Sequence, residues 1–421
     1  MSPKESSLPD APTLATLGVC IYLVGFASPV PSQLPLLLFV VFAVFSSFRG
    51  GARVGSAPRP LTWSVALFLL TTAASVFFSL DRPRSLALSA AWIPGVLVFV
   101  VISERLRSAN RIRVLYACLT FVAFALAATL LAAAALYGRN PHDWLSAMQM
   151  PVLVVPNDVN FLALLCPLAL VLLIDKPRSV QGILAGATIF LVALVIGVFA
   201  SRGAALTLAV SLVVAGGLFR PRLGVAVGVA IAVGFVVIDG FQGFALASKF
   251  FTRVADTRIS LWLMAWEMFL NAPWLGHGPH TFKTLYPIYL ELVQFPDWVE
   301  LDPWGGAVPW AHNLYLELLA ERGILGFAAF AGMVGTGLAI AIRVSRQRTG
   351  EVGLLASGAL ASLCGFLFSG LYETSLIRIW AVVLLCALLG AIGSLSSLPR
   401  VPDETNTRKR TRPARRGRNR R

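Results

Sequence analysis

Residues 181–219 read QGILAGATIFLVALVIGVFASRGAALTLAVSLVVAGGLF, and this stretch decides the class of fold. Two apolar runs, 181–200 and 204–219, are separated only by a short turn that contains Arg202. An α-helix needs about 20 consecutive apolar residues to cross a bilayer core. The stretch therefore predicts two membrane spans joined by a tight turn.

The rest of the chain has a similar composition. Of its 421 residues, 57% are hydrophobic and only 13% are charged, and the mean hydropathy is +0.77. Soluble domains carry about 25% charged residues, so this composition excludes a soluble multidomain protein. The cysteines all lie inside apolar runs without a partner at metal or redox spacing, and we interpret them as small apolar residues.

Similar apolar runs recur between charged breaks or breaks that contain Pro and Gly. Together they predict an all-α polytopic membrane protein with about twelve transmembrane helices. The predicted spans are 13–29, 33–48, 61–79, 86–102, 114–136, 159–174, 181–200, 204–219, 223–239, 323–342, 353–371 and 378–396.

Alternate loops are rich in Lys and Arg, which predicts that they lie in the cytoplasm together with both termini. Most of the other loops are short and poor in charge, and in one large outer loop acidic residues outnumber basic ones. We divide the chain into spans one to nine (1–239), the outer loop (240–322), spans ten to twelve (323–397) and a tail (398–421). The tail is basic and predicted to be disordered, and anionic lipid is a more natural partner for it than nucleic acid.

Arg202 lies on the outer side of the membrane in this topology, where the charge rule disfavours arginine. Two interpretations stay open. The side chain reaches the interface to keep its charge in water, or it is a fixed cation whose planar fork binds the phosphate of a lipid headgroup.

The outer loop begins with a predicted amphipathic helix. Arg258, Trp262 and Trp266 are four residues apart, which places them on one helical face. We expect this face to lie on the membrane surface, with Arg253 and Arg258 reaching polar headgroups. The Trp-rich segment 287–310 then reads as an irregular or briefly helical lid, whose rings suit either sugar stacking or interfacial anchoring.

His312 stands directly before the apolar run NLYLELLAERGILG, residues 313–326. A histidine at the start of a helix is more often a capping or packing residue than a catalyst. The topology nevertheless places His312 on the same side of the membrane as Arg202 and Arg258. A neutral base beside fixed cations is a plausible site for chemistry on an anionic lipid. We expect the glycines of ERGILG to allow close helix packing.

Taken in order, these motifs resemble the O-antigen ligase and O-antigen polymerase superfamily of bacterial envelope glycosyltransferases. The matching pieces are SRGA at 201–204, R-x-x-x-W at Arg258 and Trp262 followed by NAPWLGHGPHTF, and H-N-x-x-L-x-x-x-x-E-x-G-x-x-G from His312. The resemblance covers essentially the whole chain. It implies a GT-C-like membrane fold in which 240–322 is a periplasmic loop.

His277 and His280 depart from this pattern, because the family usually has small or apolar residues near these glycines. They leave open which histidine acts as a base, although His312 fits the pattern best.

The resemblance implies transfer of a glycan from an undecaprenyl pyrophosphate carrier to a sugar of the lipid A-core. This reaction takes place at the periplasmic face of the bacterial inner membrane and completes lipopolysaccharide. The alternatives are a polymerase, whose acceptor is a second carrier-linked unit, and a protein O-oligosaccharyltransferase. A transporter is less favoured, because the chain lacks the two similar halves of that class. The expected partners are the donor, the acceptor and membrane lipids, without nucleic acid.

For such a reaction the residues themselves suggest roles. Arg202 and Arg258 are the predicted catalytic cations, because a pyrophosphate leaves readily when cations stabilise its charge. His312 is the predicted general base for the acceptor hydroxyl. Direct attack inverts the anomeric centre, whereas retention requires a carboxylate nucleophile such as Glu317 or Glu321, for which we favour a structural role.

A further set of residues is expected to bind substrate: Arg253, Trp262, Asn313, Tyr315, Glu321 and Arg322. No cofactor and no metal are expected. Glu300 and Asp302 have a spacing that is compatible with a metal site, but the arginines make a metal unnecessary.

Overall fold

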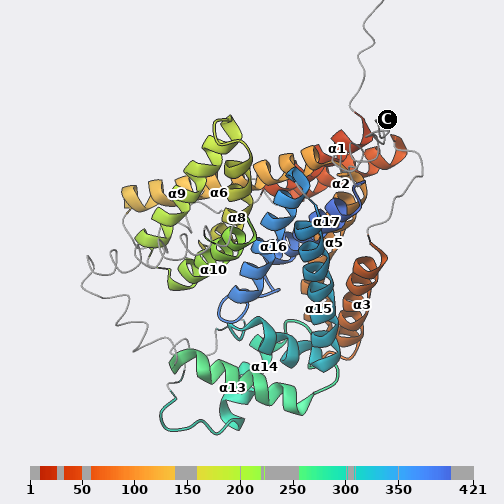
Figure 1. Ribbon diagram of the computed structural model, residues 1–421. Coiled ribbons are helices and arrows are strands. Elements are labelled where there is room, and N and C mark those ends of the chain that lie inside the picture. Colours follow the sequence, from red (N-terminus) through yellow and green to blue (C-terminus); the bar gives the residue numbers. More distant parts are fainter. Residues whose placement is uncertain are drawn as a thin grey trace, which may run out of the picture.

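The computed structural model of the protein describes residues 10–25, 33–49, 58–137, 159–199, 201–219, 222, 256–299, 301, 308, 310–348 and 350–399. Within these ranges the chain is helical and no β-strand occurs (Figure 1). The helices are α1 (Ala11–Gly25), α2 (Gln33–Arg49), α3 (Arg59–Phe77), α4 (Arg82–Ser89), α5 (Trp92–Arg105), α6 (Ala109–Tyr137), α8 (Val159–Asp175), α9 (Val180–Val198), α10 (Arg202–Phe219), α13 (Asp256–Asn271), α14 (Phe282–Leu292), α15 (Leu314–Gln347), α16 (Glu351–Ser369) and α17 (Ile379–Ser396).

The described helices include 7 that are long and apolar enough to cross a membrane, with α4 and α5 together forming one of them. Another four, α1, α2, α8 and α10, are apolar but shorter. These ranges overlap every predicted span except the ninth, 223–239, which lies outside the described residues. The protein is therefore a multi-pass membrane protein that is all-helical in its described ranges, as predicted.

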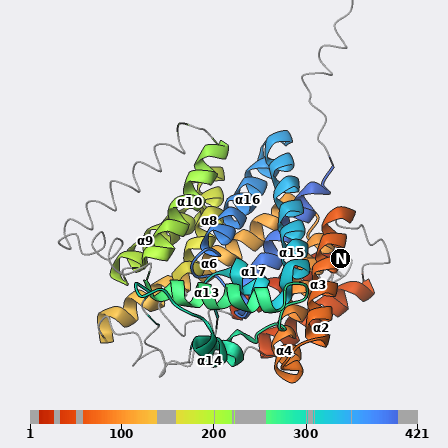
Figure 2. The same ribbon diagram turned by 90° about the horizontal axis from the view of Figure 1, so that it is seen from below.

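Among the described helices, α17 is the most deeply buried, and almost all of its residues are shielded from solvent. It packs against α5, α15 and α16, while α16 also packs against α8 and α10. Figures 1 and 2 show α15, α16 and α17 between a group made of α6, α8, α9 and α10 and a group made of α1, α2, α3 and α5. A helix that is apolar on all sides is buried either by neighbouring helices or by lipid, and in α17 neighbouring helices cover almost every residue.

The helices α13 and α14 lie together at one end of this bundle, below α15 in Figure 1 and nearest the viewer in Figure 2. Between them is a second, small hydrophobic core that includes Leu261, Met264, Phe282 and Tyr286. The aromatic spacing thus predicted a helix correctly at α13. Both α13 and α14 contact α15, so α15 joins this end to the membrane bundle.

The start of α15 differs from the predicted tenth span, 323–342. The helix already begins at Leu314, and Asn313 caps it by accepting hydrogen bonds from two backbone N–H groups at 3.0 and 3.1 Å. Such a cap satisfies amide groups that have no partner inside the helix. At Gly323 the backbone has φ 62° and ψ −171°. The predicted end of the outer loop therefore coincides with a kink inside one helix.

Gly323 allows the close approach of a turn rather than of a second helix. A Cβ atom there would lie 2.4 Å from the carbonyl carbon of Trp274, in the turn that follows α13. At Gly326 the nearest atoms belong to Arg322 of the same helix. Neither glycine of ERGILG thus has another helix among its nearest atoms, and close helix packing at Gly326 stays a prediction. The positive φ and the approaching backbone both require glycine at position 323.

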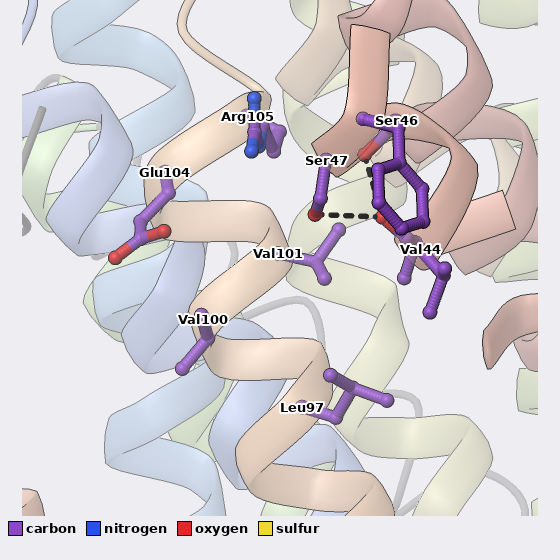
Figure 3. Close-up of a pocket in the computed structure, with 10 residues that line it drawn as sticks. Val44, Ser46, Ser47, Leu97, Val100, Val101, Glu104 and Arg105 are labelled. Carbon is purple, nitrogen blue, oxygen red and sulfur yellow. Dashed lines mark hydrogen bonds between the residues drawn. The ribbon is translucent and has the colours of Figure 1, made fainter. Parts of the chain in front are cut away.

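A pocket of about 250 Å³ lies between α2 and α5 (Figure 3). Its wall includes Leu97 and Val100, and the hydroxyls of Ser46 and Ser47 donate hydrogen bonds to the Ala43 carbonyl. No residue that the sequence predicts as catalytic lines this pocket. The chemistry proposed below therefore belongs to another region of the protein.

Candidate active site

His312 is held in a strained position just before α15. Its φ is 52°, and only His280 shares a positive φ among the described residues other than glycine. This left-handed conformation costs about 1 kcal/mol or more for such a residue, and strain of this kind clusters at functional sites. The imidazole packs against Trp310, with ring centroids 5.0 Å apart and planes inclined by 44°.

Glu373 lies at the centre of the charged groups around His312. It belongs to the loop between α16 and α17, and its side chain is 9% exposed. Its Oε2 atom is 3.6 Å from His312 Nδ1 and 3.3 Å from Arg258 Nη2. Its Oε1 atom is 3.9 Å from Arg378 Nη2. One carboxylate thus contacts a histidine and two arginines from three different helices or helix ends.

Tyr372 connects Arg258 to the turn that contains Arg202. Arg258 Nη1 donates to the Tyr372 carbonyl at 2.7 Å, and the Tyr372 hydroxyl donates to the Gly203 carbonyl at 2.7 Å. A Cβ atom at Gly203 would lie 2.7 Å from the Tyr372 ring, so glycine lets the ring approach this turn. Arg202 is close enough to Arg258 for their charges to repel. The structure therefore brings together Arg202, Arg258 and His312, which the sequence predicted as one site.

Arg378 adds a third cation to the site. It stands immediately before α17, and its Cζ atom lies 4.7 Å from the centroid of the Trp310 ring. A guanidinium over the face of an indole is attracted by the ring's electron density. Trp310 therefore packs against both His312 and Arg378.

The sequence analysis missed Glu373 and Arg378. A signal was present, because LYETSLIR at 371–378 places an acid in the predicted outer loop between the last two spans and an arginine at the outer start of the last span. Lys and Arg are normally enriched on the cytoplasmic side of the membrane, so Arg378 on the outer side is an exception to this rule, as Arg202 is.

Burial raises the pKa of Tyr372 to about 12, so its hydroxyl stays neutral at physiological pH. The remaining charged groups of the site are the three arginines and Glu373, beside the imidazole of His312. Such an arrangement is suited to binding an anion with more than one negative charge. It also offers one group, the imidazole, that can accept a proton.

Asn313 and Tyr315, both predicted to bind substrate, use their polar atoms within the protein. The Asn313 amide caps α15 and donates to the Leu371 carbonyl at 3.1 Å. The Tyr315 hydroxyl donates to the Leu367 carbonyl at 2.6 Å. These bonds fix the start of α15 against the end of α16 and the loop that follows. Contact of either side chain with a substrate stays a prediction.

Glu321 and Arg322 are enclosed by the protein. Arg322 is 0% exposed, and its Nη1 atom lies 3.5 Å from Glu321 Oε2. The other carboxylate oxygen, Glu321 Oε1, accepts from the Phe282 N–H at 3.2 Å. The pair therefore ties α15 to the start of α14. A role in substrate binding stays a prediction for both residues.

The last two residues predicted to bind substrate are Trp262 and Arg253. Trp262 is half-buried and packs against the small core between α13 and α14, where its indole nitrogen has no hydrogen-bond partner among the described residues. Arg253 lies outside the described residues, so its predicted contact with headgroups has no structural description.

The two other histidines of this region have different neighbours. His277 Nε2 lies 2.9 Å from the Met268 carbonyl and 3.2 Å from the Tyr289 hydroxyl. His280 is 2% exposed, and its carbonyl accepts from Arg84 Nε at 3.1 Å. These contacts are with α4, α13 and α14 and not with the groups around Glu373.

No cluster of three or more His, Cys, Asp or Glu side chains that could hold a metal occurs in the part of the chain that the structure describes. Glu300 and Asp302, which the sequence offered as possible ligands, lie outside that part.

These features define a polytopic membrane protein with an arginine-rich site at one end of its bundle. Residues 187–331 match the family model described as O-antigen ligase. This range contains Arg202, Arg258 and His312, so the part of the chain that carries these residues is similar to the O-antigen ligase family. No curated protein matches the chain. Glu373 and Arg378 lie beyond the matched range.

Proposed function

We propose that the protein is an O-antigen ligase that transfers a glycan from undecaprenyl pyrophosphate to a sugar of the lipid A-core. The family match supports a function of the O-antigen ligase and polymerase type, in a multi-pass membrane protein. The observation that carries the finer proposal is the contact of one carboxylate, Glu373, with both His312 and Arg258. This contact joins a potential base to a cation that suits a phosphate group.

In the proposed reaction, His312 accepts the proton of an acceptor hydroxyl. The hydroxyl oxygen attacks the anomeric carbon of the donor sugar and forms the new glycosidic bond. The bond from that carbon to the pyrophosphate oxygen breaks, and undecaprenyl pyrophosphate leaves with the electron pair. A direct displacement of this kind inverts the anomeric centre. A positioned base contributes roughly 10²- to 10⁴-fold to such a step.

Arg202 and Arg258 bind the pyrophosphate in this proposal. Negative charge increases on the leaving oxygen during the reaction, and fixed cations aimed at it stabilise the transition state more than the ground state. Planar guanidinium groups can each bind two phosphate oxygens. Because the arginines supply this charge, we propose that the reaction requires neither a metal ion nor a cofactor.

The proposed site faces the periplasm of the bacterial inner membrane, with both termini in the cytoplasm. Donor and acceptor are both anchored in the same leaflet, so a site at the end of the bundle is accessible to each of them. The basic loops predict this orientation.

The function is tested with purified protein in nanodiscs, supplied with undecaprenyl pyrophosphate-linked glycan and lipid A-core in the presence of a chelator. We expect a lipid A-core conjugate to form. Lengthening of the carrier-linked glycan without a conjugate indicates a polymerase. Movement of intact donor across a sealed bilayer without covalent transfer indicates a transporter. Dependence on added divalent ion contradicts the metal-independent mechanism.

A further inference from the structure

Glu373 has no role in the reaction as described so far, yet it contacts more charged groups of the site than any other described residue. If Glu373 served only to neutralise the positive charge of the arginines, contacts with the arginines would be sufficient. Its Oε2 atom is instead shared between Arg258 Nη2 at 3.3 Å and His312 Nδ1 at 3.6 Å. The shared oxygen distinguishes Glu373 from a simple ion-pair partner.

His312 Nδ1 is buried and has no hydrogen-bond partner in the described part of the chain. Glu373 is the carboxylate within ion-pair distance of that nitrogen. A short shift of either side chain converts the 3.6 Å contact into a hydrogen bond. Hydrogen bonds at catalytic sites are often long before substrate binds.

We propose that Glu373 is a positioning residue that binds the Nδ1–H group of neutral His312. This bond selects the tautomer in which Nε2 has a free lone pair, and it fixes the direction of the ring. In a neutral imidazole one nitrogen donates and the other accepts, so a partner at Nδ1 decides which nitrogen can take a proton. Where the reaction is the proposed glycan transfer, the acceptor proton moves to Nε2.

The loop that carries Glu373 is tied to the start of α15, and this fixes Glu373 relative to His312. The Leu314 N–H donates to the Gly370 carbonyl at 2.7 Å. The Ser375 hydroxyl lies 2.7 Å from both carboxylate oxygens of Glu317. Glu317 was read from the sequence as structural, and these bonds are consistent with that role. These hydrogen bonds hold the loop between α16 and α17 against the start of α15.

The test uses full-length protein in nanodiscs with ¹⁵N-labelled histidine, and the His312 signals are assigned from their loss in His312→Asn. We expect His312 of the wild type to be protonated mainly at Nδ1. Glu373→Ala should shift the population toward protonation at Nε2. Glu373→Gln should shift it less in the same direction, because a neutral amide oxygen accepts more weakly than a carboxylate.

The matched control is Glu351→Gln, which removes an acid that lies 2.8 Å from Arg113 Nη2. It should leave the His312 signals unchanged. An unchanged His312 tautomer in a Glu373 variant that elutes and melts as a folded protein overturns the proposal. If Glu373→Ala does not fold, the same tautomer measurement is made on Glu373→Gln.

The kinetic readout separates positioning from folding. Glu373→Ala should lower kcat by about 10²-fold, the lower end of what a positioned base contributes, with little change in KM for the donor. Glu373→Asp should recover part of kcat. The tautomer measurement needs no transfer reaction. A predicted tautomer shift without any glycan transfer therefore contradicts the proposed function and leaves the role of Glu373 intact.

Discussion

His280 is a buried imidazole whose two ring nitrogens have no hydrogen-bond partner among the described residues. Burial, and then the charges of Arg322 and Arg84, lower the pKa of His280 from its ordinary value of 6.5 to about 3. The folded protein therefore keeps this side chain neutral at pH values where the unfolded chain is protonated. Protons then favour the unfolded state between these two pKa values.

Because the pKa of His280 is lower in the folded state than in the unfolded state, the protein becomes less stable as the pH falls below 6.5. We expect His280 to lower the free energy of unfolding by about 1.4 kcal/mol for each pH unit, or about 2 kcal/mol at pH 5. His280→Asn removes the titrating group and keeps a residue type that tolerates positive φ. Melting curves at pH 7 and pH 5 measure the difference. Equal losses of stability in the variant and the wild type contradict it.

The catalytic residues that the sequence predicted are those with a signal in their immediate sequence. Arg202 is an outer arginine in a turn, and His312 precedes a helix, so each has a local signal. Glu373 has only the signal of an acid in an outer loop, which does not reveal that it lies beside His312. Its position beside His312 depends on hydrogen bonds between segments that are far apart in the chain, and these arise only when the helices pack.

The helix α15 connects the site to the membrane bundle, and Gly323 is its critical position. After the kink, the Ile324 N–H donates to the Pro273 carbonyl at 2.8 Å and the Leu325 N–H to the Trp274 carbonyl at 3.3 Å. The turn after α13 therefore supplies partners to amide groups near the kink. The sequence predicted an apolar helix here correctly. It did not predict the kink, because a glycine in a helical pattern is compatible with either close packing or a break.

Gly323→Ala should lower the free energy of unfolding by more than 1 kcal/mol, because alanine is strained at φ 62° and its Cβ would clash with Trp274. The matched control is Gly335→Ala in the same helix, where a Cβ meets no atom within 4 Å. The control should be neutral or stabilising by about 0.5–1 kcal/mol. Thermal melting in detergent compares the two variants. Equal melting temperatures would show that the kink carries no conformational constraint.

Across the bundle, hydropathy gave the class of fold and the approximate ranges of the described spans. It could not give the packing order, because α16 and α17 are apolar around most of their surface and no face identifies a neighbour. The ninth predicted span, the division into loop and tail, and the orientation in the membrane stay predictions. Each rests on charge and hydropathy patterns alone.

The orientation has a direct test in intact cells with a membrane-impermeant maleimide and a cysteine-free background. Leu80→Cys lies between α3 and α4 on the predicted outer side, and Arg107→Cys lies between α5 and α6 on the basic, cytoplasmic side. Both residues are exposed. We expect Leu80→Cys to react before lysis and Arg107→Cys only after it. The reverse pattern would place the candidate site in the cytoplasm.

The central claim is that His312 is the proton acceptor of a glycan transfer at an arginine-rich site. The most direct measurement is the single-turnover rate of transfer in nanodiscs, together with the Kd of the donor, for His312→Asn and His280→Asn. Both histidines have positive φ, so asparagine is a matched replacement at each. We predict that His312→Asn lowers the rate by about 10²-fold or more with donor Kd unchanged, while His280→Asn stays close to the wild type at pH 7. A wild-type rate in His312→Asn would contradict the account.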